Sequence, residues 1–151
     1  MIQPTQLQGL QAMSSDLQPL ALAIKRVQYK HHRALDSKLV EIGTTLSQWD
    51  ALRAISRHPD SSSHKLAGLT FQTDQSFGAL ANRMVDHGLI RRIPGEGRAI
   101  LHRLTPAGEA MLRDGHVVVN KVLAESLAPL NATERQQLHG LLNRLLDEPA
   151  R

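Results

Sequence analysis

The stretch from Thr73 to Thr105, TDQSFGALANRMVDHGLIRRIPGEGRAILHRLT, decides the fold of this 151-residue chain. Thr73 is a good N-cap, and apolar residues recur after it at helical spacing: Phe77, Leu80, Ala81, Met84 and Val85. His87-Gly88 is predicted to end this helix. Two short strands follow at 89–93 and 99–104, separated by the turn formers of 94–98. The stretch therefore predicts a helix followed by a basic-tipped hairpin, which together make a winged reading head.

The outward face of this helix carries side chains that suit a DNA duplex. Ser, Asn, Gln and Arg hydrogen-bond base edges or phosphates, while Gly and Ala let the backbone come close. The predicted DNA contacts are Thr73, Gln75, Ser76, Gly78, Ala79, Asn82 and Arg83 in the helix, and Arg98 at the hairpin tip. A solvated helix face is the alternative interpretation. The charge balance favours DNA, because Arg83, Arg91, Arg92, Arg98 and Arg103 face only Asp74, Asp86 and Glu96.

Composition bounds the class of protein. The chain is 41% hydrophobic and 21% charged, which is typical of one globular unit, and its formal charge of +4 permits a nucleic-acid partner. The absence of cysteine excludes a disulfide framework, a thiolate metal site and a cysteine-based peroxide sensor. The first 16 residues lack the features of a signal peptide, and no apolar run approaches the roughly 20 residues that span a bilayer. We therefore expect a cytoplasmic protein with no membrane association.

Upstream of the reading head, a Gln-rich arm at 1–16 precedes a long helix that is predicted to begin at Leu17 and to end at Gly43. Ser47 is predicted to cap a second helix that reaches His58-Pro59, with Trp49 facing inward. A short helix at 64–69 and a tight turn then lead into the helix after Thr73, which completes a helix-turn-helix.

Downstream of the hairpin, Thr105-Pro106 is predicted to start a long helix that reaches Pro129, with the valines of 117–119 buried by more than one neighbour. Asn131 and Glu134 form a capping pattern for a last helix, whose apolar stripe consists of Leu138, Leu141, Leu142, Leu145 and Leu146. Long amphipathic helices at both ends of the chain carry more apolar surface than a small head can cover. An intrachain core is the alternative, but the pattern favours a homodimer across a twofold axis.

The predicted fold class is mainly α with a small β-hairpin wing. It comprises an N-terminal arm at 1–16 and a single domain at 17–151. Within that domain, 47–105 form the winged helix-turn-helix region, and 17–43 and 106–147 form the dimerisation helices.

Several of these residues resemble the MarR family of bacterial transcriptional regulators, over roughly Leu17 to Leu146. The resemblance rests on LSQW at 46–49, NRM at 82–84, GLIRR at 88–92 and LTPAG at 104–108. The family's wing usually carries Asp-x-Arg, and here Glu96-Gly97-Arg98 stands in its place, so that Arg98 matches the wing arginine. Gly78 and Ala79 are smaller than the Thr and Arg that often occupy this part of the family's recognition helix.

The resemblance implies a homodimeric transcription repressor that binds a pseudo-palindromic operator in double-stranded DNA. It also implies release of the DNA when a small aromatic or phenolic acid binds between the dimerisation helices and the reading head. The candidates for holding such an effector are Tyr29, His31, His32 and Trp49, because these side chains stack on flat acids and hydrogen-bond to them. The alternatives are a histidine satisfied at the dimer interface for His31 and a core position for Trp49.

Other functions are less well supported by the sequence. No HExxH motif, phosphate-cradling glycine loop or nucleophile elbow occurs, so no enzyme activity is expected. Eight histidines raise the alternative of a metal-sensing regulator, but adjacent His31 and His32 cannot point the same way from a helix, so neither a metal nor a cofactor is expected. A winged helix that binds proteins and not DNA is the third alternative, and the arginine-rich hairpin argues against it.

Overall fold

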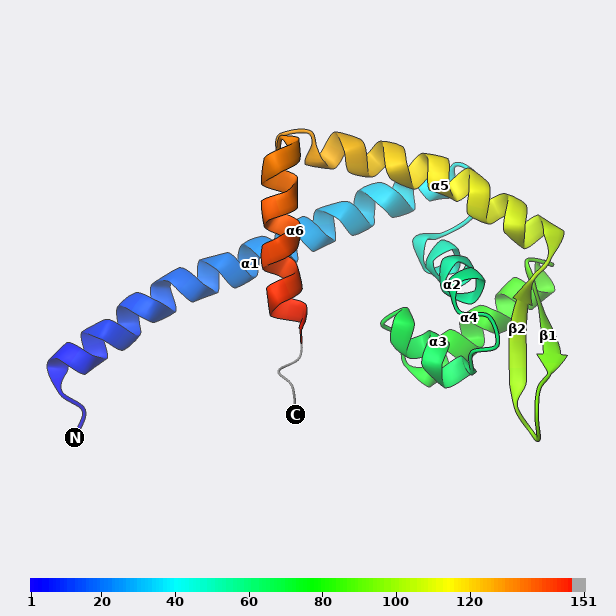
Figure 1. Cartoon of the computed structure of the whole chain (residues 1–151), viewed down its shortest axis with the longest axis horizontal. Coiled ribbons are helices and arrows are strands. Elements are labelled where there is room, and N and C mark those ends of the chain that lie inside the picture. Colours follow the sequence, from blue (N-terminus) through cyan, green and yellow to red (C-terminus); the bar gives the residue numbers. More distant parts are fainter. Residues whose placement is uncertain (148–151) are drawn as a thin grey trace.

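A computed structural model describes residues 1–147 of the chain, and Figure 1 shows the arrangement of its elements. Within these residues there are six helices and one two-stranded antiparallel sheet. In chain order they are α1 (Pro4–Val40), α2 (Leu46–Arg57), α3 (Ser63–Leu69), α4 (Asp74–Asp86), β1 (Ile90–Pro94), β2 (Ile100–Leu104), α5 (Pro106–Leu127) and α6 (Ala132–Leu146). The fold class is as predicted. We call the elements from α2 to β2 the reading head, and α1 and α6 the outer helices.

Helix α1 begins at Pro4 and not at Leu17, so the predicted arm is the first part of a single long helix (Figure 1). Its start has a local cause, because the backbone N–H of Gln3 donates to Gln6 Oε1 at 3.3 Å and Pro4 occupies the first helical position. Pro19 lies inside the helix without ending it. At 1.5 Å per residue the helix is about 55 Å long. Only its C-terminal end reaches the reading head.

Threonine and serine side chains cap the helices of the reading head. Thr73 caps α4 as predicted, accepting from the backbone N–H of Ser76 at 3.1 Å, and Ser62 caps α3 in the same way. The cap of α2 is Thr45 and not Ser47, since Thr45 Oγ1 accepts from the backbone N–H of Gln48 at 3.2 Å. Phe71, in the turn between α3 and α4, adopts a left-handed φ of 55° and is fully exposed.

The reading head has a core of its own. Its buried residues come from all three of its helices and from the start of the wing: Ala51, Leu52, Ala54, Ile55, Leu66, Ala67, Phe77, Leu80, Ala81, Met84, Leu89 and Ile90. This burial fixes which face of α4 points inward. The opposite face is left to solvent.

The wing is a hairpin in which β1 pairs with β2 from Ile90 opposite Leu104 to Pro94 opposite Ile100. Both strands begin one residue later than predicted, and β1 also ends one residue later, at Pro94. The backbone N–H of Gly95 donates to the carbonyl of Ala99 at 2.8 Å, and Gly97 has a φ of 64°. Only a residue that tolerates left-handed backbone suits this position, which explains the glycine at the tip.

Helix α5 packs closely on the reading head at two glycines. A Cβ added at Gly108 would lie 2.0 Å from the carbonyl oxygen of Leu89, and one added at Gly115 would lie 2.1 Å from the indole of Trp49. Trp49 belongs to a second core cluster that joins α2 to the end of α1 and to α5. The helix ends at Leu127, before Pro129. Of the valines at 117–119, only Val119 is buried within the chain, whereas Val117 is exposed, contrary to the prediction.

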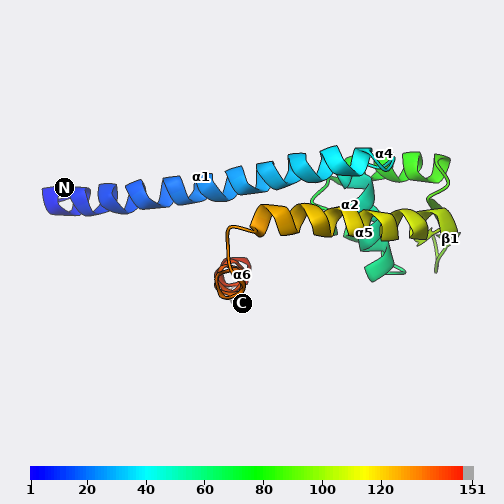
Figure 2. The same ribbon diagram turned by 90° about the horizontal axis from the view of Figure 1, so that it is seen from above.

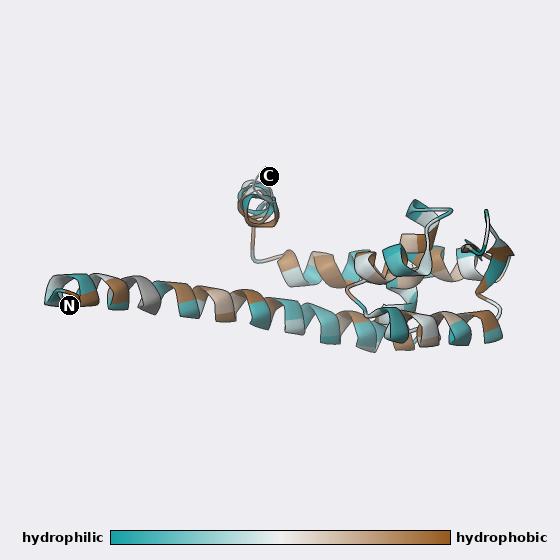
Figure 3. Cartoon of the chain, turned by 90° about the horizontal axis from the view of Figure 1, so that it is seen from below, coloured by the Kyte–Doolittle hydropathy of each residue, from teal (hydrophilic) through white to brown (hydrophobic). Residues whose placement is uncertain are grey.

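The outer helices leave their apolar faces uncovered. No residue of α6 is buried against the rest of the described chain, and Leu141 and Leu145 are 55% and 71% exposed. Figure 2 shows that α6 stands clear of α1, although the two overlap in Figure 1. Apolar residues of α1 point into solvent along its length, and Figure 3 shows them as uncovered bands. In residues 1–147 no helix is both long and apolar enough to cross a membrane.

Candidate nucleic-acid interface

The exposed face of α4 presents the residues that the sequence predicted as DNA contacts. Gln75, Ala79 and Asn82 are spaced i, i+4 and i+7 and therefore lie in one row along the helix, and all three are exposed. Ser76 and Arg83 are exposed beside this row. Phe77 and Met84 hold the opposite face in the core. The exposed face therefore offers amide, hydroxyl and guanidinium groups on a rigid support.

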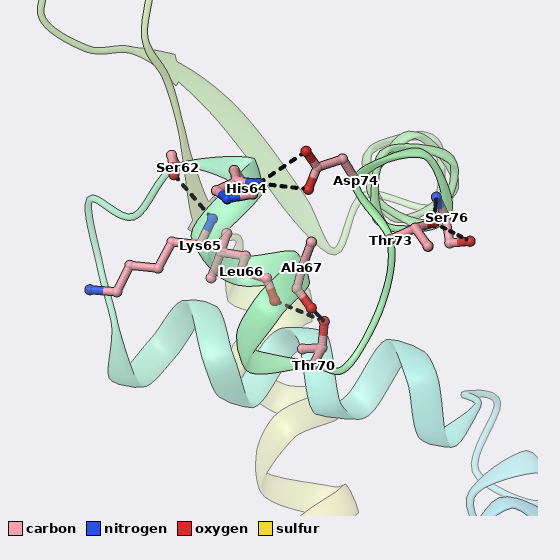
Figure 4. A network of polar contacts seen from close by, with 9 residues as sticks. All are labelled: Ser62, His64, Lys65, Leu66, Ala67, Thr70, Thr73, Asp74 and Ser76. Atoms are coloured by element: carbon pink, nitrogen blue, oxygen red, sulfur yellow. Dashed lines mark hydrogen bonds and ion pairs between the residues drawn. The ribbon is translucent and has the colours of Figure 1, made fainter. Parts of the chain in front are cut away.

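The N-terminal turn of α4 is tied together by polar contacts, which Figure 4 shows from close by. Thr73 Oγ1 accepts from the backbone of Ser76 and lies 3.0 Å from Ser76 Oγ, so the two hydroxyl groups are partly engaged with each other. His64 Nδ1 lies 2.9 and 3.0 Å from the two carboxylate oxygens of Asp74. This contact between α3 and α4 was not predicted, because residues ten apart in sequence meet only through the turn.

Gly78 and Ala79 form the flat part of the face. A Cβ added at Gly78 would meet no atom of the described chain within 4 Å, so the space above this residue is open. Packing inside the chain therefore does not require a glycine here. The open surface allows the close backbone approach that was predicted.

Asn82 connects α4 to the wing. Arg92 on β1 donates from Nη2 to Asn82 Oδ1. Because the guanidinium group has only donors, the carboxamide oxygen faces the arginine and the NH2 group points away from it. The wing is therefore held against the exposed row of α4.

The five arginines that were counted from the sequence differ in how their charge is balanced. Arg103 pairs with Asp60, which lies outside the stretch from which the excess was counted. Arg92 keeps its charge uncompensated, since Asn82 is neutral. Arg83, Arg91 and Arg98 are exposed and form no ion pair within residues 1–147. Four of the five therefore remain available to phosphates.

Arg98 lies at the tip of the wing, next to Gly97 in its left-handed conformation. The tip residues Glu96, Gly97 and Arg98 are all exposed. Figure 1 shows the tip pointing away from α5 and the outer helices. A long cation in this position can reach a neighbouring duplex without disturbing the core.

His102 lies on the face of the wing that packs against α4. Its side chain is buried, its Nδ1 has no partner among the described residues, and its ring packs edge-on against Phe77 of α4 at a centroid distance of 6.1 Å. Burial, together with the charge of Arg92 on the facing strand, lowers the pKa of His102 below its ordinary value of 6.5. His102 is therefore a neutral packing residue that links the wing to α4.

The four predicted effector residues occupy different surroundings. Tyr29 is exposed on α1, with the guanidinium group of Arg33 at 5.7 Å from its ring centroid, and His31 is half-buried. Trp49 is 2% exposed, and its indole N–H donates to the carbonyl of Leu112 at 3.2 Å. Trp49 therefore fills a core position, which was the alternative interpretation.

His32 lies near a charged pair that the sequence did not suggest. The carboxylate of Asp50 lies 3.5 Å from the guanidinium group of Arg53, which in turn lies 5.2 Å from the ring of Trp49. Burial raises the pKa of Asp50, while Arg53 and His32 act to lower it. The i, i+3 spacing of Asp50 and Arg53 on α2 was the available signal.

Among residues 1–147, no group of three or more His, Asp or Glu side chains could hold a metal ion.

Comparison with known proteins shows what the chain is similar to. The sequence profile of the MarR family matches residues 42–99, which comprise the reading head up to the wing tip. The HTH-type transcriptional repressor Rv2887 of Mycobacterium tuberculosis is 28% identical over 133 residues, which cover 87% of this chain and 96% of the relative.

Solved structures of that relative have the same fold. Its complex with DNA has a TM-score of 0.70 and 27% identity, and covers 84% of this chain and 97% of that chain. Its complex with salicylic acid has a TM-score of 0.71 and 28% identity, and covers 84% and 96%. The reading head thus matches the MarR family, and most of the chain has the fold of a solved repressor that is 27–28% identical to it.

Proposed function

We propose that the protein is a repressor that binds a pseudo-palindromic operator as a homodimer in the cytoplasm and is released by a small aromatic acid. The observation that carries the proposal is the position of the wing beside the exposed row of α4, which Arg92 joins to Asn82. Helix and wing thus face one surface, on which Arg83, Arg91, Arg92 and Arg98 have no acidic partner within residues 1–147. A related repressor has been solved with DNA.

The outer helices support the dimer. Exposed apolar side chains lie along α1 and α6, among them Leu20, Ile24, Leu141 and Leu145. Contiguous apolar surface of this kind is rare on monomeric proteins and marks an interaction site. A second copy of the chain would cover it across a twofold axis, and the two α4 helices would then enter half-sites about 34–36 Å apart.

The test of DNA binding is Arg98→Ala. Selection of fragments from sheared genomic DNA provides the operator, and titrations at two salt concentrations then compare the variants. We expect Arg98→Ala to lose roughly 1–3 kcal/mol of specific binding and to show a shallower salt dependence with unchanged folding. Arg98→Lys should recover part of the affinity, because ammonium holds its hydration more tightly than guanidinium does.

Arg113→Ala is the matched control, since Arg113 is an exposed arginine on α5, outside both α4 and the wing. It should bind like wild type. Equal affinities for wild type, Arg98→Ala and Arg98→Lys would remove the wing as a DNA contact. A footprint confined to one half-site would argue against the dimeric arrangement.

The proposed effector site lies near His32, Asp50 and Arg53, where α1 approaches α2 beside Trp49. The related repressor has been solved with salicylic acid, and a guanidinium group suits such a carboxylate. Tyr29 and His31 lie along the same part of α1. Salicylate should therefore release the operator from wild type at lower concentration than from His32→Ala.

His139→Ala is the control for that experiment, because His139 is an exposed histidine on α6. It should respond to salicylate like wild type. If His32→Ala also responds like wild type, His32 is not part of the effector site. If salicylate leaves the wild-type complex intact, the proposed effector class is wrong.

A further inference from the structure

Asn82 is placed to read a base edge. It lies in the exposed row of α4 with Gln75 and Ala79, and Ala79 offers only a methyl group. An unconstrained asparagine in a major groove pairs with adenine through two hydrogen bonds, using its oxygen as acceptor and its NH2 group as donor. That pairing requires both ends of the carboxamide to face the base.

In this protein one end is occupied. Arg92 Nη2 donates to Asn82 Oδ1, so the carboxamide oxygen faces the wing. Arg92 lies opposite His102 in the hairpin, and buried His102 packs on Phe77 at the base of the same helix. The strand that carries Arg92 is therefore anchored to α4. The NH2 group of Asn82 is the end left to face a ligand.

We infer that Arg92 is a positioning residue that sets the direction of hydrogen bonding by Asn82. Asn82 then presents its NH2 group and selects a base by its acceptors, of which guanine offers two in the major groove, O6 and N7, whereas adenine N7 and thymine O4 are single. The carboxamide oxygen is turned toward the wing and away from the adenine amino group that bidentate pairing needs. This inference rests on the proposed DNA binding and concerns the same face of α4.

The contrast with Arg103 supports a role beyond bracing. Arg103 is paired with the carboxylate of Asp60, which neutralises it. Arg92 is paired with a neutral amide, so it retains a full positive charge beside the exposed row. A carboxylate at position 82 would hold Arg92 as well but would provide no donor to a base. The asparagine combines both properties.

The experiment is selection from a randomised duplex library with the full-length protein and three variants: Arg92→Met, Asn82→Ala and Arg91→Met. Arg91 is the matched control, because it is an exposed arginine at the adjacent position of β1, and Asn82 accepts its hydrogen bond from Arg92. Each variant is first shown to unfold with the wild-type urea midpoint. The readout is the base preference at each position of the selected half-site.

We expect wild type to prefer guanine to adenine at one symmetric position of the operator, because guanine offers the NH2 group of Asn82 two acceptors. Arg92→Met should gain a preference for adenine there, because the carboxamide oxygen is released, and Asn82→Ala should lose all preference at that position alone. Arg91→Met should keep the wild-type preference even though its affinity falls. A brace without a positioning role would change affinity and leave base preference unchanged.

A double-mutant cycle on the wild-type operator covers the case in which Arg92→Met selects no sequence. If Arg92 acts through Asn82, Arg92→Met should weaken binding about tenfold more than the charge-matched Arg91→Met does, and this excess should vanish when residue 82 is alanine. Losses that multiply would overturn the inference, as would an unchanged base preference in Arg92→Met or in Asn82→Ala. If wild type itself enriches no sequence, the proposed DNA binding has failed, which is a separate result.

Discussion

The reading head and the outer helices use apolar residues in opposite ways. In the reading head, residues such as Phe77 and Met84 are buried by neighbours from the same chain. In the outer helices, residues at equally regular spacing, such as Leu141 and Leu145, remain exposed. The periodicity of a helix thus predicts that one face will be covered but not which chain will cover it. The reading head has its core within one chain, whereas the apolar faces of the outer helices are uncovered in that chain.

The largest effect is expected from Leu142→Asp in α6, which tests whether a second copy of the chain covers this helix. If a second copy covers α6, the substitution buries an unpaired carboxylate among leucines and should cost at least about 3 kcal/mol, or more than about 100-fold in the dimer Kd. Sedimentation equilibrium measures this change. Asn143→Asp is the control, because position 143 faces away from the leucine stripe, and it should leave association intact. A dimeric Leu142→Asp protein would place the interface elsewhere.

Gly108→Ala tests the reading head and its junction with α5. The added methyl group would lie 2.0 Å from the Leu89 carbonyl oxygen, so the backbone itself must move. We expect a loss of about 2–3 kcal/mol in the free energy of unfolding, measured by urea titration. The dimer Kd of the folded fraction should not change. A stability equal to wild type would mean that α5 does not pack as closely as described.

A smaller effect is expected from pH, and it should be confined to the reading head. The pKa of His102 is lowered in the folded protein, so the unfolded chain binds the proton more readily. Stability should therefore be fully present above pH 6.5 and decline as pH falls below it, by at most about 1.4 kcal/mol per unit from this group. Urea midpoints between pH 8 and pH 5 measure the slope.

His102→Leu should flatten that slope, because it removes the titrating group. His87→Gln is the control, since His87 is exposed at the end of α4 and should keep the wild-type slope. If both variants keep it, another group causes the loss of stability in acid.

The smallest effect is expected from Gly140→Ala, on the face of α6 that points away from its leucines. A Cβ at this position meets no atom of the described chain within 4 Å. Alanine should therefore stabilise the helix by about 0.5–1 kcal/mol through its better helix propensity. Thermal unfolding measures this gain. A loss of thermal stability would instead show that a second copy covers this face of α6 as well as the leucine face.

Local chemistry explains which parts of the fold were predictable. Thr73, Thr105 and Asn131 were predicted as caps and are caps, because a capping side chain bonds to a backbone N–H only three residues away. The start of α1 was missed although its signal is also local, in Gln3, Pro4 and Gln6.

The cap of α2 was wrong for a different reason. Thr45 and Ser47 are both hydroxyl residues two positions apart, and local sequence does not separate them. The start of the helix is fixed by α1, since Asp36 Oδ1 accepts from the backbone N–H of Leu46 at 2.9 Å. A contact between residues ten apart across a turn is not a periodic signal.

The candidate DNA face was predictable as a set of residues, because the buried stripe of α4 leaves the other face outward. Its connections were not. The bond from Arg92 to Asn82 and the pair of Arg103 with Asp60 depend on the register of the hairpin and on how the wing lies against α4 and the loop after α2. Arg103 is accordingly balanced by an acid that lies outside the stretch whose charges were compared from the sequence.

Thr105 joins the start of α5 to the segment that directly follows α4. Its hydroxyl donates to the carbonyl of Gly88 at 2.5 Å, and its backbone N–H donates to the carbonyl of Leu89 at 3.0 Å, so the end of α4 and the start of α5 share one pivot. From this pivot α5 extends as a stiff rod of about 33 Å toward α6. A rotation of about 10° about the pivot corresponds to about 6 Å of travel at the far end of such a rod. Because α5 is packed on the reading head at Gly108 and Gly115, a torque applied at its far end would turn α4 and the rest of the reading head as one body.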